Sequence, residues 1–184
     1  MIEECVIIGG GVAGLSAANR LADSGASPLI VDGGEYPCYR LCGEYFSHES
    51  FPILRKWGIP LSGKINFVRF IKGNQKIGFQ LPVSAASCSR FDFDVKLFER
   101  ALKNGARALC KTTVEAMRLP HISGEPYELD LSNNQTIKAR HLMIGTGKLF
   151  GSMSPLRLPT MISADSKMET RWCCGETGFH QSIR

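Results

Sequence analysis

The stretch Gly9-Gly10-Gly11-Val12-Ala13-Gly14 contains the pattern G-x-G-x-x-G, and the segments on both sides of it carry clear structural signals. Residues 5–8 form a short, mostly β-branched run that predicts a buried strand. Residues 15–22 are rich in alanine and leucine, contain no glycine or proline, and predict a helix. Residues 28–31 predict a second strand, and Asp32 follows it directly. This order of strand, glycine-rich turn, helix, strand and acid predicts the opening βαβ unit of a dinucleotide-binding fold.

Each glycine of the pattern has its own physical reason. Gly9 permits the tight turn, Gly11 lets the backbone approach a pyrophosphate, and Gly14 lets the helix pack on the strand. The helix N-terminus offers N–H groups and the positive end of its dipole to phosphates. Asp32 is placed to bind a ribose hydroxyl, and it favours FAD or NAD over NADP because a 2′-phosphate would be repelled. A purely structural glycine turn is the alternative.

The middle of the chain predicts a different kind of structure. Ser47 is expected to cap a helix of about ten residues that ends at Gly58. Alternating apolar residues around the turn Gly73-Asn74 then predict a β-hairpin, which we place within residues 61–85. Because a hairpin interrupts the alternation of strands and helices, we expect it to belong to an inserted antiparallel sheet.

Helix and strand signals alternate again after residue 90. Apolar residues at helical spacing predict a helix over residues 93–102, and residues 106–110 predict a return to the parallel sheet. Residues 113–119, 127–131 and 136–144 predict three short strands that form a β-meander crossover. We therefore expect an α/β protein with a Rossmann-type parallel sheet, a β-meander crossover and part of an inserted antiparallel sheet.

Composition excludes several classes of protein. The 184 residues are 43% apolar and 21% charged, which is typical of a folded domain. The net charge of +5 comes from scattered residues without a basic block, so we expect no nucleic-acid partner. No apolar run is long enough to cross a membrane, and Glu3 and Glu4 stand where a signal peptide would be basic. We therefore expect a cytoplasmic protein without an integral membrane segment.

The cysteines predict neither a disulfide framework nor a metal site. Their number is odd, no two form a C-x-x-C pair, and no cysteine–histidine cluster has zinc-finger spacing. We expect reduced thiols at Cys5, Cys38, Cys42, Cys88, Cys110, Cys173 and Cys174.

Beyond the glycine pattern, several blocks of sequence resemble one family of enzymes. Pro37-Cys-Tyr-Arg-Leu-Cys-Gly-Glu44 resembles the P-x-x-K-x-C-G stretch of geranylgeranyl reductase-like flavoproteins, with Arg40 in place of the lysine. Those proteins belong to the p-hydroxybenzoate hydroxylase-like superfamily of FAD-dependent oxidoreductases. Residues 47–59, the block Arg90-x-x-Phe-Asp94 and residues 139–147 are similar to further segments of the same enzymes. The resemblance covers roughly residues 2–150 and implies an FAD-binding domain over residues 1–150.

The resemblance also implies which residues hold the cofactor. The glycine loop would bind the FAD pyrophosphate, Asp32 the adenosine ribose, and Arg40 the ribityl-phosphate side, while Arg90 would help to fix the cofactor. The Val114 backbone would meet adenine, and residues 146–147 would pass close to the adenosine half. The full implied set is Gly9, Gly11, Val12, Ala13, Gly14, Asp32, Gly33, Arg40, Arg90, Val114, Thr146 and Gly147. For Arg40 and Arg90 the alternative is ordinary surface charge.

Cys42 has two interpretations. In the resembling family this cysteine lies near the flavin and the substrate, and a redox role would need a pKa lowered by a nearby positive charge such as Arg40. The alternative is a small packing residue. We assign no catalytic residue.

The sequence also departs from the family pattern. It contains no Gly-Asp dipeptide, which in these flavoproteins forms the second cofactor segment, and residues 151–184 resemble nothing in the family. We expect an FAD-dependent oxidoreductase of the reductase or monooxygenase type, acting on a small-molecule substrate by hydride transfer, with NADH or NADPH as a candidate reductant. Its form would be a truncated or frame-shifted gene product, a split enzyme completed by another chain, or a domain that works alone. An NAD-binding dehydrogenase module and a non-catalytic nucleotide-binding remnant are the alternatives.

Overall fold

The computed structural model describes residues 2–40, 42, 44–120, 122 and 124–147. These residues form two units, one made of residues 2–38 and 94–147 and the other of residues 39–93. Each unit contains one β-sheet, of six strands in the first and three in the second. The predicted atypical tail, residues 151–184, lies outside the described residues.

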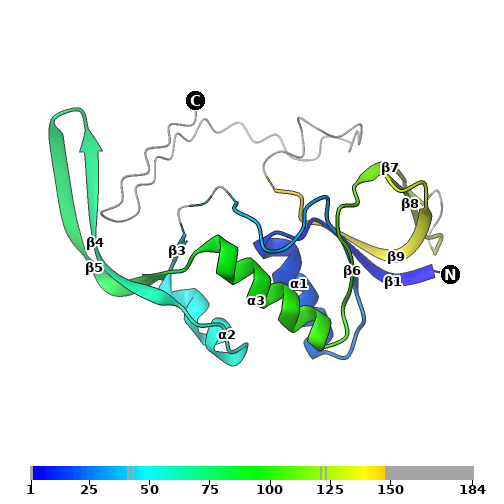
Figure 1. Ribbon diagram of the computed structural model, residues 1–184, viewed down its shortest axis with the longest axis horizontal. Helices are drawn as coiled ribbons and strands as arrows, with labels where there is room; N and C mark the ends of the chain where they lie inside the picture. The colour runs from blue at the N-terminus through cyan, green and yellow to red at the C-terminus, as the bar shows by residue number, and fades with distance from the viewer. Residues whose placement is uncertain (1, 41, 43, 121, 123, 148–184) are drawn as a thin grey trace. The chain divides into compact units, whose positions relative to one another are not determined.

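The sheet of the first unit is parallel on one side and antiparallel on the other (Figure 1). Its strand order is β6-β2-β1-β9-β8-β7, in which β1 pairs in parallel with β2 and β9, and β2 pairs in parallel with β6. Strands β7, β8 and β9 form an antiparallel meander. The bounds are β1 (Ile2–Ile8), β2 (Leu29–Val31), β6 (Arg107–Leu109), β7 (Val114–Arg118), β8 (Tyr127–Leu131) and β9 (Thr136–Ile144). The predicted Rossmann-type sheet with a β-meander crossover is confirmed.

Two helices cover one face of this sheet's parallel strands. Helix α1 (Val12–Asp23) follows β1, and α3 (Arg90–Lys103) enters the first unit at residue 94 and runs beside α1 (Figure 1). Ile7 lies beneath α1, and the side chains of Leu15 and Leu97 are fully buried. No helix among the described residues has the length and apolar character needed to cross a membrane.

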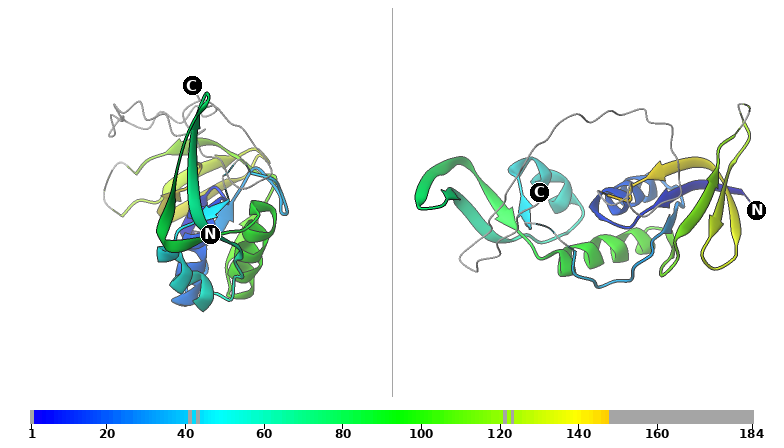
Figure 2. Two further views of the ribbon diagram at one scale, coloured as in Figure 1. Left: turned by 90° about the vertical axis from the view of Figure 1, so that its left-hand side faces the viewer. Right: turned by 90° about the horizontal axis from the view of Figure 1, so that it is seen from above.

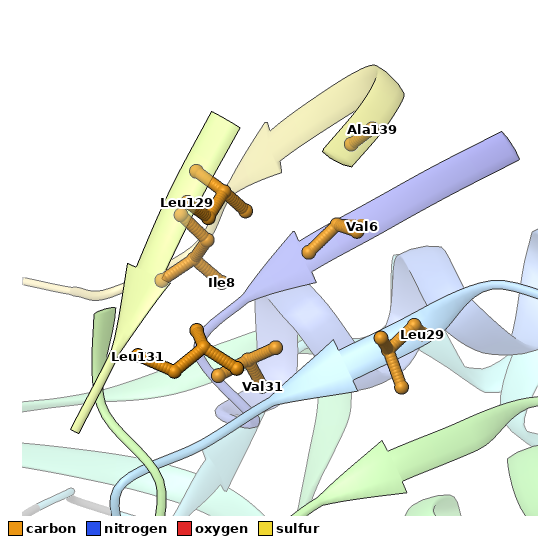
Figure 3. Packing of buried hydrophobic residues seen from close by; sticks show 7 residues of the cluster. All are labelled: Val6, Ile8, Leu29, Val31, Leu129, Leu131 and Ala139. Atoms are coloured by element: carbon orange, nitrogen blue, oxygen red, sulfur yellow. The ribbon is translucent and has the colours of Figure 1, made fainter. Parts of the chain in front are cut away.

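The opposite face of the sheet carries the main hydrophobic cluster. Because side chains alternate along a strand, Val6 and Ile8 point away from the helices and pack beside Leu29 and Val31. Figure 3 shows the meander residues closing over them, with Leu129 beside Ile8 and Leu131 beside Val31. Burying an aliphatic side chain of this size contributes about 1.5–3 kcal/mol. The cluster comprises Val6, Ile8, Leu29, Val31, Leu129, Leu131 and Ala139.

One buried polar residue joins the two helices of the first unit. Asn19 of α1 has no exposed surface, and its side-chain amide donates to the carbonyls of Leu15 (2.9 Å) and Leu97 (2.8 Å). Its amide oxygen accepts a hydrogen bond from Arg100 of α3 at 2.8 Å. Arg100 also pairs with Asp23 at 2.7 Å. Asn19 therefore satisfies the backbone of both helices at their contact.

The second unit is built around a long antiparallel hairpin (Figure 2). Its strand order is β3-β5-β4, with β3 (Tyr45–Phe46), β4 (Ser62–Lys72) and β5 (Gln75–Ser87). The predicted hairpin with its turn at Gly73 is confirmed, and only β5 extends beyond the predicted bounds, to Ser87. The outer part of the hairpin leaves several large apolar side chains half or more exposed, among them Phe70, Ile71 and Ile77.

The helix predicted from Ser47 to Gly58 is wrong in one respect. The structure divides it into a 3-10 turn, η1 (His48–Ser50), and a short helix, α2 (Phe51–Lys56). Pro52 lies in the first turn of α2, where its missing N–H and fixed φ suit a helix start but not a helix interior. The predicted end at Gly58 is confirmed by its φ of 67°.

Candidate functional site

The glycine loop begins where β1 ends, between the ends of β2 and β9. The Gly9 N–H donates to the Val31 carbonyl at 2.8 Å, and the Gly145 N–H donates to the Ile8 carbonyl at 2.7 Å. Gly9 has a φ of 100°, and a Cβ built there would lie 2.6 Å from the Gly145 carbonyl oxygen. Both its backbone conformation and the lack of space therefore require glycine, as predicted for the tight turn.

Gly14 is required by packing alone. A Cβ at this position would lie 1.8 Å from the Gly9 carbonyl oxygen and 3.2 Å from Cγ2 of Ile7. Neither the loop carbonyl nor the strand below can move without disturbing the sheet. The predicted role of Gly14 in bringing helix α1 against strand β1 is confirmed.

Gly11 differs from both of these glycines. Its φ of −81° and ψ of −173° are open to any residue, and a Cβ there would have nothing within 4 Å. Gly11 is also the N-cap of α1, so no side chain caps the first turn, and that turn contains no acidic residue. The first N–H groups of a helix have no intrahelical acceptor and lie at the positive end of its dipole. The open space at Gly11 therefore fits an anionic group that must come close to the backbone, such as a pyrophosphate.

Asp32 is buried at the carboxyl end of β2 and is anchored to the same loop. Its Oδ2 accepts a hydrogen bond from the Gly10 N–H, and its Oδ1 accepts one from the Gly34 N–H at 2.7 Å. A carboxylate has about four lone-pair sites, so each of its oxygens can accept more than one hydrogen bond. Asp32 therefore both shapes the glycine loop and offers an acceptor beside it.

The segment that follows β6 borders Asp32 on the far side. The Asp32 N–H donates to the Leu109 carbonyl at 3.0 Å, and the Thr112 N–H donates to the Asp32 carbonyl at 3.1 Å. A Cβ at Gly33 would lie 2.7 Å from Cγ2 of Thr113, and Val114 begins β7 one residue later. The structure thus brings the predicted residues 32 and 33, at the carboxyl end of β2, close to the segment that leads into residue 114.

Cys110 lies in this bordering segment as a free thiol. Partial burial, together with the negative charges of Asp32 and Glu35, raises the pKa of the Cys110 thiol. A raised pKa keeps the thiol protonated at neutral pH and makes it a poor nucleophile. Cys110 is therefore a structural neighbour of the site.

The end of β9 forms the other border of the glycine loop. The Cα of Thr146 would lie 3.0 Å from a Cβ at Gly9, and Thr146 itself is exposed. Gly147 has a φ of 78°, a conformation that favours glycine. The predicted residues 146 and 147 thus lie at the turn that faces Gly9.

Arg40 and Arg90 belong to the other unit. Arg40 is half-buried, and the backbone N–H of Arg90 donates to the Glu44 carboxylate at 3.2 Å at the start of α3. Cys42 is exposed, and its sulfur accepts a hydrogen bond from the Glu44 N–H at 3.4 Å. The predicted part of Arg40 and Arg90 in cofactor binding stays a prediction, and both interpretations of Cys42 stay open.

Sequence reasoning missed Gly10 and Tyr36. A Cβ at Gly10 would lie 1.8 Å from the Tyr36 hydroxyl and 2.8 Å from Oδ2 of Asp32, so a side chain there would have to displace both groups. The Tyr36 hydroxyl donates to the Gly10 carbonyl. Three glycines in a row hint at a special role for the middle one, but no local pattern marks Tyr36 as its partner.

Comparison with known proteins identifies relatives that share this architecture. A family profile described as pyridine nucleotide-disulphide oxidoreductase matches residues 3–161. An uncharacterized protein of Methanosarcina barkeri (strain Fusaro / DSM 804) is 27% identical over 152 residues, which cover 77% of this chain and 36% of that protein. The chain therefore spans just over a third of that relative's length.

Solved structures with a similar fold include a halogenase, a reductase-like protein and a flavin-dependent brominase. The halogenase PltM gives a TM-score of 0.64 at 24% identity, covering 78% of this chain and 35% of that protein. A geranylgeranyl bacteriochlorophyll reductase-like protein from Thermoplasma acidophilum gives 0.63 at 21% identity, covering 80% and 40%. The flavin-dependent brominase Bmp2 gives 0.66 at 18% identity, covering 80% and 39%. The predicted resemblance to geranylgeranyl reductase-like flavoproteins over the first part of the chain is confirmed at the level of the fold.

Proposed function

Because the chain belongs to the pyridine nucleotide-disulphide oxidoreductase family, we propose that it binds FAD and provides the nucleotide-binding part of a flavin-dependent oxidoreductase. The observation that carries this proposal is the contrast among the loop glycines. At Gly9 and Gly14 the protein's own backbone occupies the space that a side chain would need. At Gly11 this space is open and adjoins the N-terminus of α1. The fold itself does not require a glycine at this position, where the helix dipole attracts phosphate. A bound phosphate that needs the space next to the backbone would explain the glycine.

The neighbouring residues support an adenosine diphosphate moiety in one orientation. The pyrophosphate would lie against Gly11, Val12 and Ala13, and Asp32 would accept a hydrogen bond from a ribose hydroxyl. Adenine would lie toward Gly33 and the Val114 backbone, with residues 146–147 beside the adenosine half. The Asp32 carboxylate would disfavour a further phosphate on that ribose, because the two negative charges would repel each other.

The remaining predictions concern the flavin end of the cofactor and rest on family resemblance. Arg40 would pair with phosphate oxygens on the ribityl side, and Arg90 would help to hold the cofactor. When bound, a flavin supplies hydride transfer through its N5 atom. The chain's own residues would orient it and keep water away. Cys42 would pack beside it or take part in redox chemistry.

The substrate and the reductant are proposed at the level of chemical class. PltM has been solved with phloroglucinol and FAD, which supports a small-molecule substrate for this architecture. NADH or NADPH would supply the electrons. Turnover would also depend on residues that bind the substrate. If the enzyme is split between two polypeptides, a complementing chain would supply them.

The direct test is cofactor retention by the purified chain. Adding FAD, removing free ligand by gel filtration and recording the visible spectrum should leave bound flavin absorbance near roughly 370 and 450 nm. ADP in excess should displace it, because it fills the same phosphate and ribose positions. Retention of NAD but not FAD would favour the dehydrogenase-module alternative, and retention of neither would contradict the proposal.

A further inference from the structure

Tyr36 makes two contacts that no sequence pattern predicts. Its hydroxyl donates a hydrogen bond to the Gly10 carbonyl, 26 residues away. Its ring stacks on Phe98 of α3, with the ring centroids 4.1 Å apart and the planes inclined by 17°. Tyr36 thereby connects the glycine loop to α3, within the first unit.

Gly10 is consequently held at both of its backbone polar groups. Its N–H donates to Oδ2 of Asp32, while its carbonyl accepts from the Tyr36 hydroxyl. Gly10 is the middle of three consecutive glycines, the residue type that loses most conformational freedom when it is fixed. Gly9 and Gly11 are already tied to the sheet and to α1, so without these two bonds Gly10 would be the residue left to be ordered by the ligand, and that entropy would be lost on binding.

We infer that Tyr36 is a positioning residue, which holds the glycine loop in its binding conformation before any ligand arrives. The expected effect of Tyr36 on binding rests on the proposed cofactor site, since a preorganised loop increases affinity only if a ligand binds to it. The hydroxyl acts through Gly10, and the stack on Phe98 keeps the hydroxyl at the loop. Asp32 fixes the N–H side of Gly10, and Tyr36 fixes the carbonyl side.

The variant Tyr36→Phe tests this directly, because it keeps the ring and its stack on Phe98 and removes only the hydroxyl. A single hydrogen bond of this kind corresponds to about a fivefold effect on an equilibrium. We therefore expect FAD to bind about fivefold more weakly. In the absence of FAD, the amide hydrogens of residues 9–11 should exchange about fivefold faster, with the unfolding midpoint changed by no more than a few degrees.

Tyr39→Phe is the matched control, since Tyr39 is 85% exposed and lies in the other unit. It should change neither the exchange of the loop amides nor FAD affinity. If Tyr36→Phe leaves loop exchange unchanged in the unliganded chain, the positioning role is wrong, whether affinity falls (a direct ligand contact) or only the midpoint falls (a packing role). Should the parent chain retain no FAD, the proposed function fails, while loop exchange still decides the role of Tyr36.

Discussion

The glycine loop of the first unit and the β4–β5 hairpin of the second differ in what surrounds their glycines. In the loop, a Cβ on Gly14 would meet a backbone carbonyl at 1.8 Å. In the hairpin, a Cβ on Gly78 would meet the ring of Phe67 at 2.3 Å, and that side chain is 47% exposed. The carbonyl belongs to Gly9, in a tight turn tied to β2 by the bond from the Gly9 N–H to Val31, so it cannot yield, whereas an exposed ring can rotate. The two regions should therefore respond very differently to the same substitution.

The same contrast extends to polar and apolar side chains. The first unit buries Asn19 and Ile30 almost completely, whereas the hairpin exposes Asn66 and 70% of Ile77. Buried groups lose their water and must find partners inside, so their removal leaves cavities or unsatisfied atoms. This difference defines matched pairs of variants, one in each region.

The largest effect is expected for Gly14→Ala. The new methyl group cannot fit against the Gly9 carbonyl, and we expect a loss of about 4 kcal/mol or more in the free energy of unfolding, a large share of a domain's stability. Gly78→Ala should change it by less than about 1 kcal/mol, because Phe67 can move into solvent. Urea unfolding followed by circular dichroism measures both, and equal losses would contradict the comparison.

The second pair consists of Asn19→Ala and Asn66→Ala. Removing the Asn19 amide leaves the Leu97 carbonyl and part of Arg100 without their buried partner, which should lower the free energy of unfolding by about 2 kcal/mol. Asn66 is exposed and accepts a hydrogen bond from Ser84 at 2.6 Å, which water can replace. Its loss should cost less than about 0.5 kcal/mol by the same unfolding measurement. A cost at Asn66 as large as that at Asn19 would show that the hairpin is not the tolerant region.

The third pair removes one methylene group from an isoleucine. Ile30 is 1% exposed in β2, and Ile30→Val should lower the free energy of unfolding by about 1 kcal/mol. Ile77→Val should leave it unchanged within about 0.3 kcal/mol, because the side chain already contacts water. Thermal unfolding of the two variants beside the parent chain would measure this, and a lower midpoint for the hairpin variant would contradict it.

The smallest effect concerns the ion pairs of the meander. Lys138 and Arg118 lower the pKa of Glu128, and Arg118 with the Thr136 hydroxyl lowers the pKa of Asp130. A carboxyl whose pKa is lower in the folded state stabilises the fold above its unfolded-state pKa, about 4, and loses that contribution as the pH falls through the folded value. Arg118→Gln should therefore lower the unfolding midpoint slightly at pH 7 and leave it unchanged near pH 2. If the unfolding midpoints of variant and parent still differ at pH 2, the ion pairs of Arg118 are not the cause of the difference.

Much of the fold could be predicted because its signals are local. The glycine spacing, the apolar runs and the turn at Gly73 each describe a few neighbouring residues, and the structure contains the corresponding strands, helices and hairpin. The split of the helix near Pro52 and the two-residue strand β3 were missed, since pairing and turn geometry decide elements this short.

The site could be predicted only where it is made of consecutive residues. Gly9, Gly14 and Asp32 follow a known spacing, and the structure gives each a packing or hydrogen-bonding reason. Tyr36 and Asn19 act on partners far along the chain, and a single sequence contains no sign of such contacts. Contacts between residues far apart in the chain are thus the part of the structure that local sequence patterns do not predict.

The central claim is that the space at Gly11 is kept open for a cofactor phosphate, and Gly11→Val tests it most directly. A valine at this position has ordinary backbone angles available, and no atom beyond the adjoining residues lies within 4 Å of its Cβ, so the free energy of unfolding should change by less than about 1 kcal/mol, the size of an N-cap effect. Titration of FAD into both proteins should show binding to the parent and at least about 100-fold weaker binding to the variant, or ~2.7 kcal/mol. A folded variant that binds FAD as tightly as the parent would contradict the claim.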